Sequence, residues 1–184
     1  MFRPFGFWQF EIVSLARPSA VPGRAKFGII QGNIMKIYIG ADHRGFSLKK
    51  KIIDHLATVG YQVIDMGIDQ EGVVCDYPKI AHAVGTQVAK SKNGKGILVC
   101  MTGIGHSIAA NKIPGVYAAL CYNREAAELS RRHNNSNVLV LGARFVEEKD
   151  IFSIIDAWLN TEFEGGRHLR RTKQIKEIEK EFLK

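Results

Sequence analysis

From Met35 onward the chain alternates short apolar runs with amphipathic stretches, and this alternation most constrains what it can fold into. Residues 36–40 form a short β-rich run, and residues 46–59 follow with apolar side chains at helical spacing, ended by Gly60. Residues 96–100 are almost all apolar, as expected of a central parallel strand that is buried on both faces. Repeated alternation of strand and helix predicts a parallel sheet covered by helices on both sides.

The rest of the chain continues this pattern. We expect further strands at 62–66, 116–120 and 138–141, helices at 78–89, 123–133 and about 151–159, and a polar tail helix from about Arg170. Five strands predict an α/β fold, a single-domain Rossmann-like three-layer sandwich with a five-stranded parallel sheet over residues 35–184. In such sheets ligands gather at the C-terminal ends of the strands.

Residues 1–34 do not share the pattern, since they hold three of the five prolines and show no sustained period. The segment is basic and poor in acids, which allows a targeting peptide, but it lacks the compact apolar stretch and cleavage site of a secretory signal. We interpret residues 1–34 as an irregular N-terminal extension, with Met35 as the functional start.

Composition excludes several classes of protein. Hydrophobic residues make up 46% of the 184 residues and no apolar run reaches the roughly 18 residues of a membrane span, so we expect a soluble protein with no membrane partner. The net charge of +8 is spread along the chain without an aromatic-interleaved basic stripe, and no nucleic-acid partner is expected. The three cysteines lack C-x-x-C spacing, which favours a reduced, cytoplasmic setting without disulfides or a zinc site.

Asp42 and His43 directly follow the first predicted strand. An acid and an imidazole at a strand end could move protons on a bound hydroxyl group. Alternatively, Asp42 only caps the following helix, a role that Asp performs well.

The stretch from Cys100 to Ser107 contains glycines between a buried strand and a helix, so its backbone N–H groups can bind an anion. It completes neither G-x-G-x-x-G nor the P-loop pattern. Cys100 ends the strand, where a helix N-terminus would lower the pKa of its thiol and make it reactive. Cys75 and Cys121 are interpreted as inert buried cysteines.

A third group of polar residues lies later in the chain. Residues 131–135 (Arg-Arg-His-Asn-Asn) end a predicted helix, and Arg144 follows the last strand. Arg167 and Arg171 are four residues apart, so on a helix both could bind one phosphate. A helix cap or a solvated surface explains each group equally well, and His55, His82 and His106 are given no function.

These stretches together resemble type B ribose-5-phosphate isomerases, a family that also holds the subunits of galactose-6-phosphate isomerase. The matching stretches are residues 40–43, 76–78, 100–105, 107–112, 130–134 and 164–168. The resemblance runs from Met35 nearly to the C-terminus.

The resemblance implies a homodimer or a dimer of dimers with shared active sites. It also implies that the substrate is a small-molecule sugar phosphate and that catalysis needs no metal or cofactor. It implies that Cys100 is the proton-transferring base and that Thr102 assists proton movement on the sugar oxygens. It also implies that His133 opens the sugar ring with the help of Asp42. The substrate-binding residues that it implies are His43, Tyr77, Met101, Gly103, Ile104, Gly105, Asn134, Arg144, Arg167 and Arg171.

The expected reaction is the interconversion of ribose 5-phosphate and ribulose 5-phosphate in the pentose phosphate pathway, through an enediolate. Isomerisation of galactose 6-phosphate or allose 6-phosphate is the alternative, and a non-catalytic sugar-phosphate or nucleotide sensor is a second one. Two positions depart from the family: Met101 stands where Gly is usual, and His106 where an aliphatic residue is usual. Met101 keeps its backbone N–H, so the anion site survives if this residue needs no positive φ.

Overall fold

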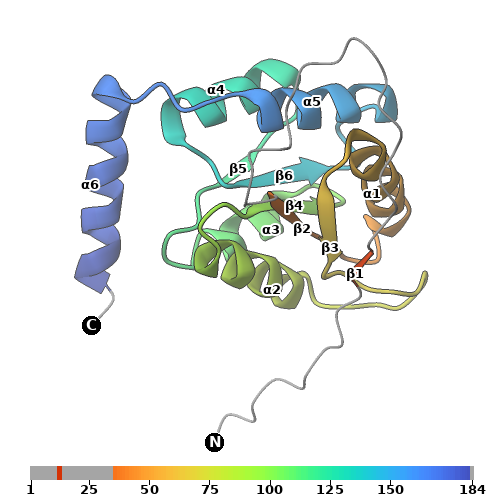
Figure 1. Ribbon diagram of the computed structural model, residues 1–184. Helices are drawn as coiled ribbons and strands as arrows, with labels where there is room; N and C mark the ends of the chain where they lie inside the picture. Colours follow the sequence, from red (N-terminus) through yellow and green to blue (C-terminus); the bar gives the residue numbers. More distant parts are fainter. Residues whose placement is uncertain (1–11, 14–34, 183–184) are drawn as a thin grey trace, which may run out of the picture.

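The computed structural model describes residues 12–13 and 35–182, and Figure 1 shows their arrangement. Helices and strands alternate along the chain as the sequence predicts. The strands are β1 (Ile12–Val13), β2 (Lys36–Ala41), β3 (Gln62–Asp65), β4 (Lys95–Cys100), β5 (Ala118–Leu120) and β6 (Val138–Gly142). The helices are α1 (Phe46–Val59), α2 (Tyr77–Lys90), α3 (Ile104–Ala110), α4 (Arg124–Asn134), α5 (Glu148–Asn160) and α6 (Gly166–Phe182).

The sheet has the order β1-β3-β2-β4-β6-β5. Strands β2 to β6 are all parallel, which confirms the predicted five-stranded parallel sheet. The strand order reverses between β2 and β4, and in a doubly wound sheet this switch point is where ligands bind.

Strand β1 is an addition that the sequence pattern did not indicate. Its two residues pair antiparallel with β3, with Ile12 opposite Ile64 and Val13 opposite Val63. The prediction of a wholly irregular segment 1–34 was therefore wrong at residues 12–13. The other residues of that segment lie outside the described part of the chain.

The sheet is covered on both faces, so the three-layer sandwich is confirmed (Figure 1). Helices α1, α4 and α5 cover one face, and Ile37, Ile97 and Leu139 of the sheet are buried beneath them. Helices α2 and α3 cover the other face, over Leu98 and Val140. Alternate residues of each strand point to opposite faces, which explains why neighbouring residues of β4 belong to different cores.

Two element boundaries differ from the sequence prediction. Helix α6 begins at Gly166 rather than near Arg170, because Gly165 and Gly166 both adopt positive φ and turn the chain directly into the helix. Strand β5 begins at Ala118 rather than Val116, because the backbone N–H of Tyr117 donates its hydrogen bond to Oδ1 of Asn137 and not to a neighbouring strand.

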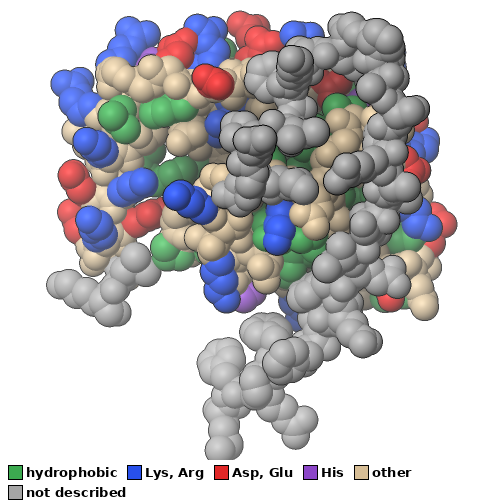
Figure 2. All heavy atoms as spheres, viewed as in Figure 1, with side chains coloured by type: hydrophobic (Ala, Val, Ile, Leu, Met, Phe, Trp, Pro, Cys, Tyr) green, Lys and Arg blue, Asp and Glu red, His purple; other side chains and the backbone are tan. Residues whose placement is uncertain are grey.

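Helix α6 stands at the side of the sheet away from α1 (Figure 1), and it contacts the rest of the described chain mainly through α4. Only two of its side chains, His168 and Thr172, are buried. Basic and acidic side chains alternate on the face of α6 visible in Figure 2, so this face is not a basic stripe. Within the described ranges, no helix is long and apolar enough to cross a bilayer.

Candidate active site

Asp42 follows β2 directly and is buried, with 5% of its surface exposed. Its Oδ1 accepts hydrogen bonds from the backbone N–H groups of Arg44 at 2.9 Å and Gly45 at 3.2 Å. A short carboxylate side chain favours this turn because it can bond the backbone two and three residues ahead. Oδ1 therefore orders the turn that leads into α1, and Oδ2 stays available for another partner.

That partner is Cys100, the last residue of β4. Its thiol donates a hydrogen bond to Oδ2 of Asp42, with 3.0 Å between Sγ and the oxygen. The pair forms because β2 and β4 are neighbours whose ends are in register, with Ala41 opposite Val99. A nucleophile and a carboxylate thus meet at the switch point of the sheet.

The pKa of the Cys100 thiol is raised above its ordinary value. Burial is the largest cause, and the hydrogen bond to Asp42 and the charge of its carboxylate add to it. The backbone N–H groups of Gly103 and Thr102 lower the pKa, as expected at the start of a helix, but they do not outweigh the other causes. The sequence-based expectation of a lowered pKa was therefore wrong in direction.

The loop from Met101 to Gly105 carries the chain from β4 into α3. Gly103 has φ of +78° at the start of that helix, a conformation that favours glycine. Positive φ among the described non-glycine residues occurs only at Asn135, so Met101 meets the condition set above and keeps a usable N–H. The Thr102 hydroxyl accepts a hydrogen bond from the backbone N–H of Ile104, with 3.3 Å between Oγ1 and the nitrogen.

Tyr77 and Arg144 lie beside this loop. The Tyr77 ring packs so closely on Gly105 that a Cβ there would lie 2.7 Å from ring carbons. The backbone N–H of Arg144 donates to the Met101 carbonyl at 2.9 Å, and its side chain is exposed. Both residues are therefore at the same edge of the sheet as Cys100.

His106, for which the sequence suggested no function, is fully buried beside Asp42 and Cys100. Burial lowers the pKa of its imidazole to about 4, so the ring is neutral at pH 7. Neither ring nitrogen has a hydrogen-bond partner, and Nδ1 of His43 also lacks one. The one feature of the sequence that pointed to His106 was that a histidine stands where an aliphatic residue is usual.

A second polar group lies around the end of α4. The rings of His133 and His168 stack at 4.2 Å between centroids, and both approach Glu164, at 3.8 Å and 3.7 Å. The pKa of Glu164 is lowered, chiefly by its hydrogen bond from Arg132. Asn134, Arg167 and Arg171 are exposed nearby in the chain, on α4 and α6.

The two groups lie at opposite ends of the sheet. Helix α4 returns the chain to the start of β6, so His133 lies only five residues before Val138, the first residue of that strand. Cys100 pairs with Gly142, the last residue of β6. Four steps along a strand span about 13 Å, so one chain does not bring His133 to Cys100.

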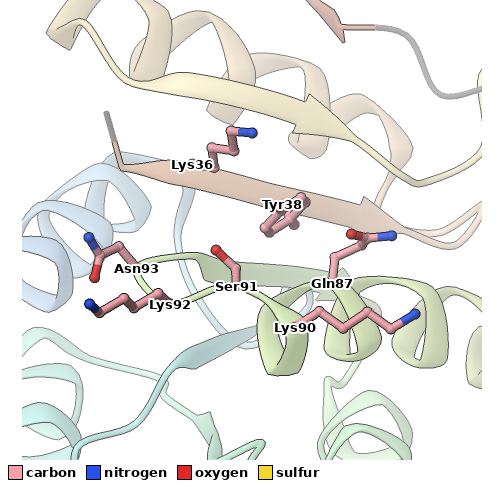
Figure 3. Close-up of a pocket in the computed structure, with 7 residues that line it drawn as sticks. All are labelled: Lys36, Tyr38, Gln87, Lys90, Ser91, Lys92 and Asn93. Atoms are coloured by element: carbon pink, nitrogen blue, oxygen red, sulfur yellow. The ribbon is translucent and has the colours of Figure 1, made fainter. Parts of the chain in front are cut away.

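A cavity of about 270 Å³ lies elsewhere, at the start of β2 and the end of α2 (Figure 3). Its lining residues are Lys36, Tyr38, Gln87, Lys90, Ser91, Lys92 and Asn93. These side chains offer no carboxylate, imidazole or thiol for proton transfer, and the cavity is at the end of the sheet opposite to Asp42. It is not the site defined by Asp42 and Cys100.

Comparison with known proteins identifies the family of this chain. A family model described as Ribose/Galactose Isomerase matches residues 37–175, and the chain belongs to this family. It is 46% identical over 144 residues to ribose-5-phosphate isomerase B of Escherichia coli, covering 78% of this chain and 96% of that protein. A probable ribose-5-phosphate isomerase B of Mycoplasma genitalium is 45% identical over 146 residues, covering 79% and 96%.

Solved structures agree with this assignment. Ribose-5-phosphate isomerase B of Clostridium thermocellum superposes with a TM-score of 0.78 at 47% identity, over 80% of this chain and 99% of that one. The Mycoplasma genitalium enzyme with bound ribulose 5-phosphate gives 0.77 at 44% identity, over 80% and 97%.

Proposed function

We propose that this protein is an aldose–ketose isomerase that interconverts ribose 5-phosphate and ribulose 5-phosphate, with Cys100 as the base. The hydrogen bond between Cys100 and Asp42 at the switch point carries the proposal, because it gives a buried thiol an adjacent proton acceptor. The names of the relatives support the reaction, and one of the similar structures contains ribulose 5-phosphate.

In this proposal Cys100 moves a proton between carbons 1 and 2 of the open-chain sugar. Asp42 accepts the hydrogen bond of the thiol over 3.0 Å, and we propose that it takes the thiol proton only transiently during the reaction, because it raises the pKa of the resting thiol. One base suffices because both carbons present the same face in a cis-enediolate. Thr102 transfers protons on the two oxygens.

The loop supplies the electrostatic stabilisation. In this proposal the backbone N–H groups of the loop from Met101 to Gly105 stabilise the charge that develops on the enediolate oxygen, and such fixed donors often give the largest catalytic contribution. We propose that His43 and Tyr77 contact the sugar, which is supported by the unpartnered Nδ1 of His43 and by the packing of the Tyr77 ring on Gly105 of the loop.

The remaining residues require a second copy of the chain. Since His133 and Asn134 lie before the start of β6 and Cys100 pairs with its last residue, we propose a homodimer, or a dimer of dimers, in which these two residues and Arg167 and Arg171 complete the site of the neighbouring copy. His133 then opens the sugar ring, and Arg167 and Arg171 bind the phosphate together with Arg144. The exposed apolar side chains of α6 support such an interface; they are Leu169, Ile175, Ile178 and Phe182.

The proposed cellular setting follows from the reaction and the cysteines. Interconversion of these two sugars belongs to the pentose phosphate pathway. All three cysteines are free, which favours a reducing compartment such as the cytoplasm.

The test is an assay of the purified protein with ribose 5-phosphate, and then with galactose 6-phosphate and allose 6-phosphate. Cys100→Ala should fold and bind ribose 5-phosphate, but its turnover should fall roughly 100- to 10,000-fold. Cys121→Ala makes the same change at another buried cysteine and should stay active. Iodoacetamide should inactivate the wild type, with protection by substrate.

The other outcomes are distinct. Conversion of a hexose phosphate but not of ribose 5-phosphate would establish the six-carbon reaction instead. Binding of sugar phosphates without any turnover would make the protein a sensor. Appreciable turnover by Cys100→Ala would remove Cys100 from the role of base.

A further inference from the structure

His106 is the buried polar side chain that the proposed isomerase reaction leaves unused. It is completely buried on α3, and both ring nitrogens lack a hydrogen-bond partner. Buried polar groups are almost always bonded, and an unbonded one costs roughly 1–3 kcal/mol. An imidazole whose two ring nitrogens have no partner among the described residues is free to bind a ligand reversibly.

The neighbours of His106 suggest what that ligand is. Asp42, Cys100 and His106 each offer one ligand atom, and these three atoms lie within 4.8 Å of one another. In zinc sites the bonds to sulfur, nitrogen and oxygen are about 2.0 to 2.3 Å long, so tetrahedral ligands lie about 3.3 to 3.7 Å apart. Small side-chain shifts would bring all three atoms to that spacing.

We propose that Asp42, Cys100 and His106 bind a Zn²⁺ ion, with the fourth coordination position open to water. Thiolate and imidazole favour zinc over the harder cations magnesium and calcium. A carboxylate and a thiolate also balance the double positive charge. The ion takes the place of the thiol proton, which leaves to solvent as the sulfur–zinc bond forms.

The second cluster of potential ligands is much less suited to a cation. His133, Glu164 and His168 also lie close together. However, Glu164 already accepts a hydrogen bond from Arg132, and Arg167 donates from Nε to Nε2 of His168 at 3.3 Å. By contrast, Arg44, which follows Asp42 in the chain, has an exposed side chain whose Nη1 lies 3.8 Å from Sδ of Met101.

Zinc at this place would be a reversible inhibitor, since it occupies the thiolate that takes the proton from carbon. This consequence rests on the proposed isomerase function, whereas the binding of the ion does not. Inhibition should be relieved by a chelator and opposed by sugar phosphate, which competes for the same space.

The binding test uses Co²⁺ as a spectroscopic probe of the full chain. The wild type should develop thiolate-to-cobalt charge-transfer absorption and the bands of tetrahedral Co²⁺, and Zn²⁺ should abolish both. His106→Leu fills the buried space without a ligand atom, and should weaken zinc binding at least tenfold, since even loss of an outer-shell partner costs 10- to 100-fold. It should keep its isomerase activity. His82→Leu controls for histidines outside the cluster and should bind zinc as the wild type does.

Each result decides between the alternatives. Absence of a thiolate–cobalt band in the wild type, or equal zinc affinity of His106→Leu and wild type, would overturn the site. His106→Gln gives a second comparison if the Leu variant fails to fold. An active enzyme without the cobalt band refutes the zinc site alone. If the wild type shows the cobalt band but has no isomerase activity, and His106→Leu loses the band, the zinc site stands and the proposed function alone is refuted.

Discussion

The thiol of Cys100 and the carboxylate of Asp42 join the ends of two adjacent parallel strands, with 3.0 Å between Sγ and Oδ2. Asp42 is held for this contact by its own turn, because Oδ1 is occupied by two backbone N–H groups. The carboxylate therefore has two effects on the thiol: it accepts its hydrogen bond, and it raises its pKa.

Replacing Asp42 by Asn should separate these two effects. The amide oxygen can keep both backbone hydrogen bonds, but the negative charge and the strong acceptor are lost. The pKa of Cys100 should fall, because the carboxylate raises it in the wild type. Alkylation by iodoacetamide, measured against pH, should shift to lower pH, while turnover of ribose 5-phosphate falls roughly 100-fold or more.

Both proteins should carry Cys75→Ser, because Cys75 is only partly buried and would also react. Cys121 is buried, and burial raises the pKa of its thiol to about 11, so it should not contribute near neutral pH. An alkylation profile of the Asn variant that stays unchanged or moves to higher pH would contradict the stated influence of Asp42.

A chain that begins at Met35 should fold and keep its isomerase activity. Strand β1 contributes only the pairing of two residues to the edge of β3, and each hydrogen bond is worth about 1 kcal/mol. The free energy of unfolding, measured in urea, should therefore fall by no more than about 1–3 kcal/mol. An insoluble or inactive truncated protein would show that the first 34 residues are needed.

Sequence patterns predicted the parts of the site that depend on strand ends. Asp42 follows one buried apolar run and Cys100 ends another, and parallel topology brings the ends of such runs to one edge. The spacing of Arg167 and Arg171 similarly predicted one helical face, and α6 does include both residues. These predictions needed only local periodicity and one rule of topology.

The features that were missed depend on packing between distant segments. The burial of His106 comes from the docking of α3 against α2, where the Tyr77 ring meets the His106 ring edge-on at 5.9 Å. The raised pKa of Cys100 reflects a balance in which burial outweighs the helix N-terminus, and a sequence does not give that balance. Strand β1 is two residues long, too short to show an alternating pattern.

Arg171→Ala should weaken binding of the sugar phosphate and leave the chemical step nearly intact. Loss of a charged hydrogen bond costs roughly 1.5–3 kcal/mol, so KM should rise roughly 10- to 150-fold while kcat changes little. Arg170→Ala is the matched control, since it removes an exposed arginine one position away on the same helix. An unchanged KM for ribose 5-phosphate in Arg171→Ala would rule out a phosphate contact.

Mixing two inactive variants should restore activity if each site combines residues of two chains. Within one chain His133 precedes the start of β6 and Cys100 pairs with its last residue, and the strand spans about 13 Å between these two ends. In a dimer of one Cys100→Ala chain and one His133→Ala chain, one site carries both substitutions and the other carries neither. Random exchange of equal amounts makes half of the dimers mixed, each with one working site of two, so about a quarter of wild-type activity should return.

Two controls make this result decisive. Subunit exchange is verified with differently tagged chains, and each variant incubated alone should remain inactive. A mixture of Cys100→Ala with Thr102→Ala should also recover nothing, because the two residues are adjacent to the same strand end of one chain, and every mixed site then lacks one of them. Recovery in that control would point to contamination or to independent activity of one variant, and no recovery in the main experiment after verified exchange would refute the shared site.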